Sequence, residues 1–146
     1  MSDGTCITKI LARSAYGYLT EDECTEQMDE LGLTYCYNGN DYYAGAAAAC
    51  GGKSNLPSQS QLTALAQYLY NTSSINMNSP SYYNSLTLDT SKASALGLRS
   101  SGCFLWSNQE NSSYSYGMGF MSQMAVWGSI SRHSTDSGNY VACIEK

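Results

Sequence analysis

The sequence predicts an α+β domain in which helices come before a set of short antiparallel strands. Helix caps and helical spacing of apolar residues occur between residues 20 and 69, whereas alternation at strand spacing begins only after residue 103. Helices and strands that are grouped along a chain, instead of alternating, are typical of α+β folds. The chain has 146 residues, the length of one domain that can bury a core of its own.

The composition argues against a nucleic-acid-binding protein. Hydrophobic residues make up 42% of the chain and charged residues only 13%, so uncharged polar side chains must form most of the surface. The net charge is −5, and the seven Lys and Arg residues are scattered. Because nucleic-acid affinity depends on clustered basic side chains that displace counterions, we expect no nucleic-acid partner.

The cysteines indicate an oxidising compartment, and we therefore expect an extracellular or cell-surface location. Without a C-x-x-C pair and with a single histidine, their spacing suits disulfides better than zinc. Six cysteines allow fifteen pairings, and the sequence does not choose among them. They are Cys6, Cys24, Cys36, Cys50, Cys103 and Cys143. No apolar run is long enough to span a membrane and no signal peptide is evident, so we expect no membrane contact by this chain itself.

Two helices are predicted before residue 50. Thr20 can cap a helix over Glu21–Leu31, which carries acidic residues at its positive end, and Gly32 can end it. Its apolar stripe is thin, so we expect this helix on the surface of the core, where a disulfide from Cys24 could fasten it. An alanine-rich stretch predicts a second, short helix over Tyr42–Ala49, ended by two glycines.

The clearest helical signal follows Pro57. Ser58 and Gln61 have the spacing of a capping box. The next residues form one apolar stripe at helical spacing, made of Leu62, Leu65, Ala66 and Leu69. This pattern predicts a helix that packs on the core. Residues 71–85 are rich in Ser and Asn, which hydrogen-bond their own backbone, and they predict a long surface loop.

Strand signals dominate the rest of the chain. Residues 104–106 form a short apolar run, and within residues 113–120 large side chains alternate with Ser and Gly. Gly128 and residues 131–138 predict turns, and residues 139–144 predict a last strand. No internal repeat is evident and no linker divides the chain, so we expect one domain.

An ordered series of short motifs resembles a known family. Its members are Ala49-Cys50-Gly51-Gly52, Leu56-Pro57-Ser58, the helix through Leu62, Trp106-Ser107 with Glu110-Asn111, Tyr116 to Phe120, Trp127, Arg132 and Ala142-Cys143. In this order they resemble the C-type lectin-like fold. Over residues 42–143 they resemble more closely the variable proteins of diversity-generating retroelements, in particular the gut-bacterial type with a pilin-like leader.

The resemblance implies a domain organisation and a disulfide. Residues 42–146 would form the C-type lectin-like domain, and residues 1–41 an N-terminal elaboration of the same domain. In that family a cysteine at the end of the first helix commonly pairs with one on the last strand, which implies a bridge between Cys50 and Cys143. The resemblance also leads us to expect an N-terminal anchor or pilin-like helix in the full-length protein.

The resemblance further implies a diversified ligand-binding face. The family copies the end of its gene from a template with errors at adenines, which turns Asn codons into codons for residues such as Tyr, Ser, Gly and Asp. Residues 112–138 are rich in these residue types and would form the variable region. Within it, Phe120, Trp127 and Arg132 would be scaffold residues. The implied ligand-binding residues are Tyr114, Gly117, Met121, Gln123, Met124, Val126, Ser129, Ile130, His133, Ser134 and Asp136.

The chemistry of this segment supports a contact surface, although one alternative stays open. Tyr gives a stiff, amphipathic contact, and Ser, Gly and Asn give adaptable hydrogen bonds, as in antibody paratopes. Alternation at strand spacing equally fits the buried side of a strand, above all for Tyr116 and Phe120. The apolar residues at implied face positions depart from the family pattern and would make the face unusually apolar; they are Met121, Met124, Val126 and Ile130.

The sequence favours neither a metal site nor an enzyme. The Glu-Pro-Asn and Trp-Asn-Asp motifs of calcium-dependent lectins are absent. We interpret the scattered oxygen-bearing residues as turn-formers, namely Glu110, Asn111, Asp136 and Asn139, and expect no cofactor. Gly-x-Ser-x-Gly is absent, and His133 lies in a Ser-rich loop without a nucleophile beside it. Cys103 lacks the nearby second cysteine that the related formylglycine-generating enzymes use.

We therefore expect a secreted or surface-displayed protein whose C-terminal face binds variable protein or glycan ligands. Two alternatives stay open. In the first, the chain is a pilin-like structural subunit whose tyrosine-rich face packs on neighbouring subunits. In the second, it is a calcium-independent glycan-binding lectin domain whose aromatic rings stack on sugars.

Overall fold

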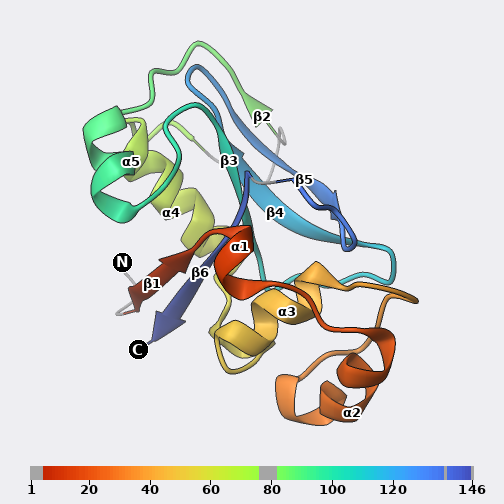
Figure 1. Ribbon diagram of the computed structural model, residues 1–146. Helices are drawn as coiled ribbons and strands as arrows, with labels where there is room; N and C mark the ends of the chain where they lie inside the picture. Colours follow the sequence, from red (N-terminus) through yellow and green to blue (C-terminus); the bar gives the residue numbers. More distant parts are fainter. Residues whose placement is uncertain (1–4, 76–81, 137, 146) are drawn as a thin grey trace.

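A six-stranded sheet with helices on both faces organises the computed structural model, which describes residues 5–75, 82–136 and 138–145 (Figure 1). The strand order is β1-β6-β3-β4-β5-β2, and neighbours are antiparallel except β3 and β6. The strands are β1 (Cys6–Leu11), β2 (Tyr82–Tyr83), β3 (Cys103–Trp106), β4 (Tyr114–Phe120), β5 (Ala125–Ser131) and β6 (Asn139–Glu145). The helices are α1 (Arg13–Tyr16), α2 (Glu21–Leu31), α3 (Tyr42–Ala49), α4 (Gln59–Leu69) and α5 (Thr90–Leu96), with a short 3₁₀ helix at Lys53–Asn55. The α+β class predicted from the sequence is therefore correct.

The two faces of the sheet belong to two separate parts of the core, because successive side chains of a strand point to opposite faces. On β3, Leu105 packs with α4 and α5, whereas its neighbour Trp106 packs with α2 and α3. On β6, Ala142 and Val141 divide in the same way. We call these sides the α4 face and the α3 face.

The first predicted helix is confirmed with its boundaries. Thr20 forms a full capping box with Glu23 at the start of α2, and Gly32 ends the helix in the left-handed conformation. Its buried residues are few, as its thin apolar stripe predicts. A disulfide between Cys24 and Cys36 fastens α2 to the segment that follows it.

The helices α3 and α4 are confirmed as well. Asp41 caps α3 by accepting a hydrogen bond from the Ala44 N–H, and the small side chains of this helix let the backbone of residues 17 and 18 approach Gly45 closely. Ser58 and Gln61 form the predicted capping box of α4. The predicted apolar stripe of α4 is its buried side.

Several elements differ from the sequence-based predictions. Gly128 does not mark a turn, because it lies inside β5 and pairs with Gly117 of β4. The predicted surface loop over residues 71–85 contains strand β2, which adds to the edge of the sheet, and part of that loop lies outside the described residues. The elements β1, α1, α5 and β5 were not predicted, and β1 brings the N-terminal segment into the sheet beside β6.

The cysteines form two disulfides. The bridge between Cys50 and Cys143, which the family resemblance implies, is present and joins the end of α3 to β6. Cys6 is an exposed free thiol, and Cys103 is a buried one whose pKa burial raises to about 11. Two disulfides are compatible with the predicted extracellular location. Within the described residues, no helix is both long and apolar enough to cross a membrane.

Candidate functional site

The predicted ligand-binding residues lie on the β4–β5 hairpin and on the loop that follows it. Residues of β4 and β5 pair in register from Tyr114 with Ser131 to Phe120 with Ala125. The Met121 N–H donates to the Met124 carbonyl and closes a tight turn. The buried Tyr70 at the end of α4 places its hydroxyl 2.6 and 2.8 Å from the two Met carbonyl oxygens, so the hairpin tip is fixed to the core.

The register divides the predicted residues between the two faces of the sheet. Tyr114 and Ser129 lie on the α4 face, on the same side as the buried Met118 and Phe120. Val126 and Ile130 lie on the α3 face. Because alternation in a strand is strict, these side chains cannot all contact one ligand from one side.

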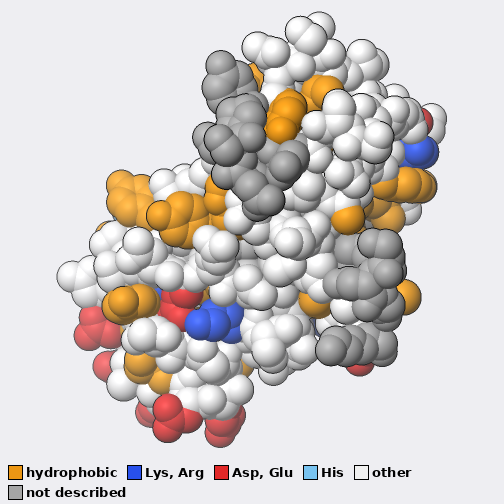
Figure 2. All heavy atoms as spheres, turned by 180° about the vertical axis from the view of Figure 1, so that it is seen from behind, with side chains coloured by type: hydrophobic (Ala, Val, Ile, Leu, Met, Phe, Trp, Pro, Cys, Tyr) orange, Lys and Arg blue, Asp and Glu red, His pale blue; other side chains and the backbone are white. Residues whose placement is uncertain are grey.

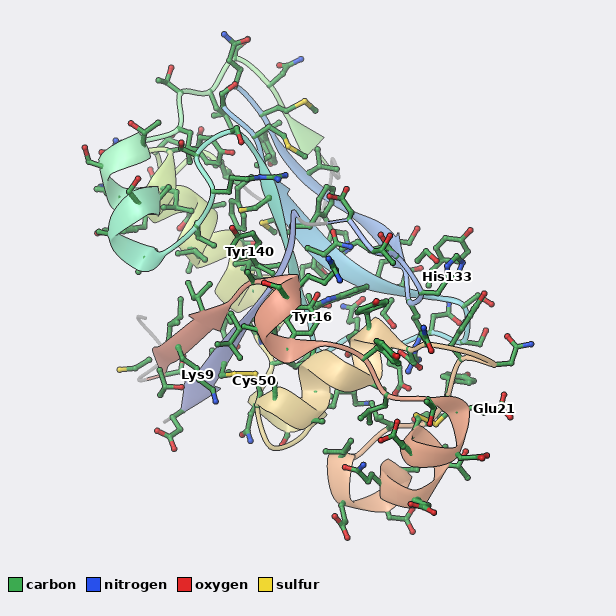
Figure 3. All side chains as sticks on the ribbon, in the orientation of Figure 1. Lys9, Tyr16, Glu21, Cys50, His133 and Tyr140 are labelled. Carbon is green, nitrogen blue, oxygen red and sulfur yellow. A yellow bond between two sulfur atoms is a disulfide. The ribbon has the colours of Figure 1, made fainter. Side chains whose placement is uncertain are left out.

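Most of the other predicted positions gather on the α3 side. The loop after β5 crosses this side of the hairpin to reach β6, as Figure 1 shows. Asp136 of the loop and Met121 of the hairpin line one small cavity of about 150 Å³. The exposed His133 lies at the opposite end of the loop, far from the Cys50 bridge (Figure 3). We define the front surface as Met121, Val126, Ile130, His133 and Asp136.

Gly117 does not contribute to this surface, although it is among the predicted residues. It is buried, and a Cβ atom placed on it would lie 2.8 Å from Cδ1 of Ile130 and against the Leu105 backbone. At Gly119, a Cβ atom would lie 2.8 Å from the Phe104 ring. These two glycines let neighbouring side chains lie flat on the sheet, so Gly117 has a packing role.

The remaining predicted residues lie at turns. Gln123 is exposed and Met124 is half-buried at the hairpin tip. The Ser134 hydroxyl accepts hydrogen bonds from the Asp136 N–H and the Asn139 side chain. The Asp136 carboxylate accepts one from the Gly138 N–H, which agrees with its interpretation as a turn-former.

A buried arginine holds the loop in place. Arg132 and Asp41 are both fully buried, and the guanidinium Nη2 lies 2.9 Å from the carboxylate Oδ2. The same guanidinium lies 3.0 Å from Glu110 and donates to the carbonyls of Tyr35 and Asn111. One side chain therefore ties the loop to the N-terminal segment, to the start of α3 and to the turn before β4.

Glu110 completes this cluster and is more than a turn-former. Its carboxylate accepts hydrogen bonds from the N–H groups of Thr34 and Tyr35, and it lies 3.1 Å from the Lys53 ammonium. Burial alone would raise the pKa of Glu110, but these hydrogen bonds and those of Arg132 and Lys53 outweigh it and lower the pKa. Two cations and two carboxylates thus leave the cluster without net charge.

The N-terminal segment adds aromatic residues that were not predicted. The Tyr37 ring lies 4.8 Å from the His133 ring, and Tyr35 is 42% exposed beside the Arg132 cluster. Nothing in the spacing of these tyrosines indicates the contact, because it depends on the Cys24–Cys36 bridge and on hydrogen bonds from far along the chain.

A second exposed area lies on the α4 face, near the open end of the hairpin. Tyr114 is 53% exposed, and the half-buried rings of Tyr116 and Trp127 stack with their centroids 5.9 Å apart. We call Tyr114, Tyr116 and Trp127 the aromatic surface. Seen from behind in Figure 2, hydrophobic side chains gather in a few patches, while Asp and Glu gather at the lower end.

The chain was compared with protein-family models, curated proteins and solved structures, and none of them matches it. The described residues contain no group of three or more His, Cys, Asp and Glu placed to hold a metal ion. The arrangement is a rigid frame, built on Arg132 and two disulfides, that presents uncharged and aromatic side chains to solvent.

Proposed function

We propose that this chain is a ligand-binding domain of the C-type lectin-like type, in which the front surface varies between copies while the frame beneath it stays constant. The observation that carries the proposal is the position of Arg132. It is fully buried and bound on all sides, yet its neighbour His133 is exposed and lies on the front surface. A fixed anchor beside an exposed side chain is what a diversified surface requires, because sequence changes at exposed positions disturb the fold little.

Other features support the same proposal. The helices α3 and α4 precede the hairpin, and a disulfide joins the end of α3 to the last strand, as the resemblance to variable proteins of diversity-generating retroelements implies. The exposed residues around the front surface include Tyr35 and other uncharged polar groups, which suit contact with protein surfaces. We further propose that the domain is secreted or displayed at the cell surface.

A display library tests this function. Met121, Val126, Ile130, His133 and Asp136 are randomised together, and a control library randomises an equal number of exposed positions on α2. Both libraries are displayed on yeast and sorted against lysozyme as the probe. We expect the front-surface library to keep the parental display level and to yield more binders than the α2 library. Loss of display, or an equal yield from the two libraries, contradicts the proposal.

The aromatic surface favours a second candidate function, calcium-independent glycan binding. Stacked, partly exposed Tyr and Trp rings present flat apolar faces of the kind that pack on sugar rings. On this alternative, a glycan array probed with the wild-type chain gives signals that Trp127→Ala abolishes and that His133→Ala leaves unchanged. Signals lost only with His133→Ala would place the ligand on the front surface instead.

A further inference from the structure

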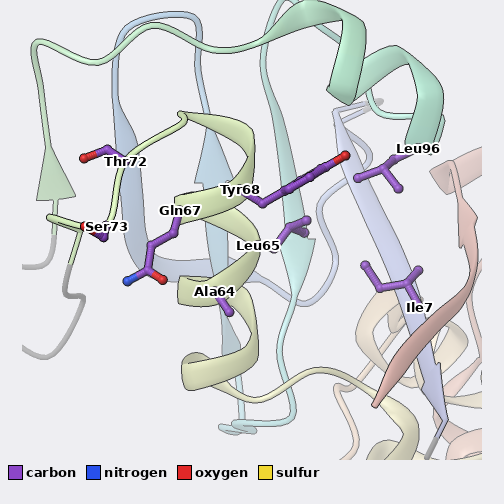
Figure 4. A pocket seen from close by; sticks show the side chains of 8 residues that line it. All are labelled: Ile7, Ala64, Leu65, Gln67, Tyr68, Thr72, Ser73 and Leu96. Atoms are coloured by element: carbon purple, nitrogen blue, oxygen red, sulfur yellow. The ribbon is translucent and has the colours of Figure 1, made fainter. Parts of the chain in front are cut away.

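A groove lies on the side of α4, away from the hairpin. It has a volume of about 610 Å³ and is bounded by α4, by β1 and by the end of α5 (Figure 4). Sites for small ligands commonly measure roughly 300–1,000 Å³. The groove therefore has the size of a small-molecule site, and nothing in the proposed function uses it.

The lining changes from apolar to polar along the groove. Ile7 and Leu96 lie at one end, Leu65 lies next to them, and the Tyr68 ring reaches from α4 so that its hydroxyl lies beside Leu96 (Figure 4). At the other end Gln67 lies with the hydroxyl residues Thr72 and Ser73 (Figure 4). A ligand that matches this arrangement of side chains along the groove has an aliphatic part and a polar head.

The polar end offers hydrogen bonds but no charge. The Thr72 hydroxyl already contacts the Ser74 hydroxyl and accepts a hydrogen bond from the Ser74 N–H. None of the residues that line the groove is ionisable near neutral pH. The amide nitrogen of Gln67 already donates to the Ile75 carbonyl, which leaves the amide oxygen as an acceptor for a ligand hydroxyl. Lys92, whose ammonium lies over the Tyr68 ring, already donates to the Tyr68 carbonyl and the Asn71 side chain. A charged head would therefore lose part of its hydration without gaining a partner of opposite charge, which is unfavourable.

The Tyr68 ring forms one wall of the groove and is held in position before a ligand binds. The Lys92 ammonium lies 4.2 Å from the centre of its ring, which fixes the ring although the side chain is 51% exposed. A wall that is fixed before binding loses little conformational entropy when a ligand arrives. Ala64 forms the floor of the groove, and its small side chain leaves the space open.

From these observations we infer that the groove between α4, β1 and α5 binds an uncharged amphiphile, with its aliphatic chain between Ile7 and Leu96 and its hydroxyl head at Gln67, Thr72 and Ser73.

Glycerol monodecanoate, used below its aggregation concentration, is the probe. Isothermal titration calorimetry should give saturable binding with one site per chain. Because each methylene contributes to burial, glycerol monooctanoate should bind about fifteenfold more weakly, or about fourfold per methylene. Decanoate, with its charged head, should bind at least about tenfold more weakly than the decanoyl ester.

Two variants and a control test the location. Ala64→Phe fills the floor and should abolish binding, whereas Thr63→Phe, on the same helix but outside the groove, should bind like the wild type. Leu96→Ser provides a second variant at the apolar end and should weaken binding. Circular dichroism establishes that each variant is folded. Absence of saturable heat, equal affinity for the two chain lengths, or unchanged binding by Ala64→Phe would overturn the inference.

Discussion

Arg132 and Asp41 lie far apart in the sequence, yet they form an ion pair from which water is excluded. The guanidinium and the carboxylate are 2.9 Å apart, and both side chains are fully buried. Asp41 also caps α3 and accepts a hydrogen bond from the Tyr37 N–H. This pair therefore couples the loop of the proposed binding surface to the helix and to the N-terminal segment.

Removing the guanidinium should strongly destabilise the protein. Arg132→Met leaves the Asp41 carboxylate buried without its charged partner, and a buried pair that loses one member typically costs about 3–5 kcal/mol. His133→Ala, one residue away but exposed, should change the free energy of unfolding by no more than about 0.5 kcal/mol. Urea denaturation measures both. Similar stabilities for the two variants would show that the cluster does not hold the loop.

The same cluster predicts loss of stability in acid. The pKa of Glu110 is lowered in the folded protein from its ordinary value of 4.5. The stabilisation from the ionised carboxylate is therefore fully present above pH 4.5 and is lost as the pH falls through the lower, folded-state pKa. Glu110→Gln should have a lower melting temperature at pH 7 and a smaller decrease in melting temperature between pH 5 and pH 3. A variant whose decrease equals that of the wild type would contradict this prediction.

The two disulfides should differ in their effect on stability. The bridge between Cys50 and Cys143 spans 93 residues, and that between Cys24 and Cys36 spans 12. On the chain-entropy account, they contribute about 4–5 and about 3 kcal/mol, respectively. Replacing each pair by alanine and unfolding both variants in guanidinium chloride should show the larger loss for Cys50 and Cys143. The reverse order would mean that α2 needs its bridge more than the sheet does.

Two glycines that face each other across the hairpin should respond in opposite ways to alanine. Gly117 and Gly128 are paired residues of β4 and β5. A Cβ atom on Gly117 would clash with Ile130 and with backbone, which should cost about 1–3 kcal/mol. On Gly128 the nearest atom would be 4.0 Å away, so alanine should be neutral or stabilise by up to about 1 kcal/mol. Thermal unfolding compares the two variants, and equal losses would exclude the packing role of Gly117.

The elements whose signals are local were predictable from the sequence. The capping boxes at Thr20 and Ser58 and the apolar stripe of α4 depend on residues within one or two helical turns, and these helices are present as predicted. Strand β1 was missed because its stability comes from pairing with β6 at the other end of the chain. Gly128 was misinterpreted because glycine marks turns and also allows close packing inside a strand.

The candidate site was less predictable because it depends on contacts between segments that are distant in the sequence. Alternation of residues in β4 was visible, but it does not tell which side of the hairpin the helix α4 covers. The contact between Tyr37 and His133 and the ion pair between Arg132 and Asp41 join segments that are distant in the sequence. No local pattern encodes such contacts.

The most direct test of the diversified surface is to sequence the genomic DNA that flanks this gene. The proposal predicts a second, near-identical copy of the stretch that encodes residues 112–143, next to a gene for a reverse transcriptase. The copy should differ from the gene only where the copy has adenines, and the differing codons should include those of the front surface and exclude those of Arg132 and Gly117. If the flanks hold no such copy, the surface is not diversified, and a fixed glycan ligand or a pilin-like subunit becomes the better account.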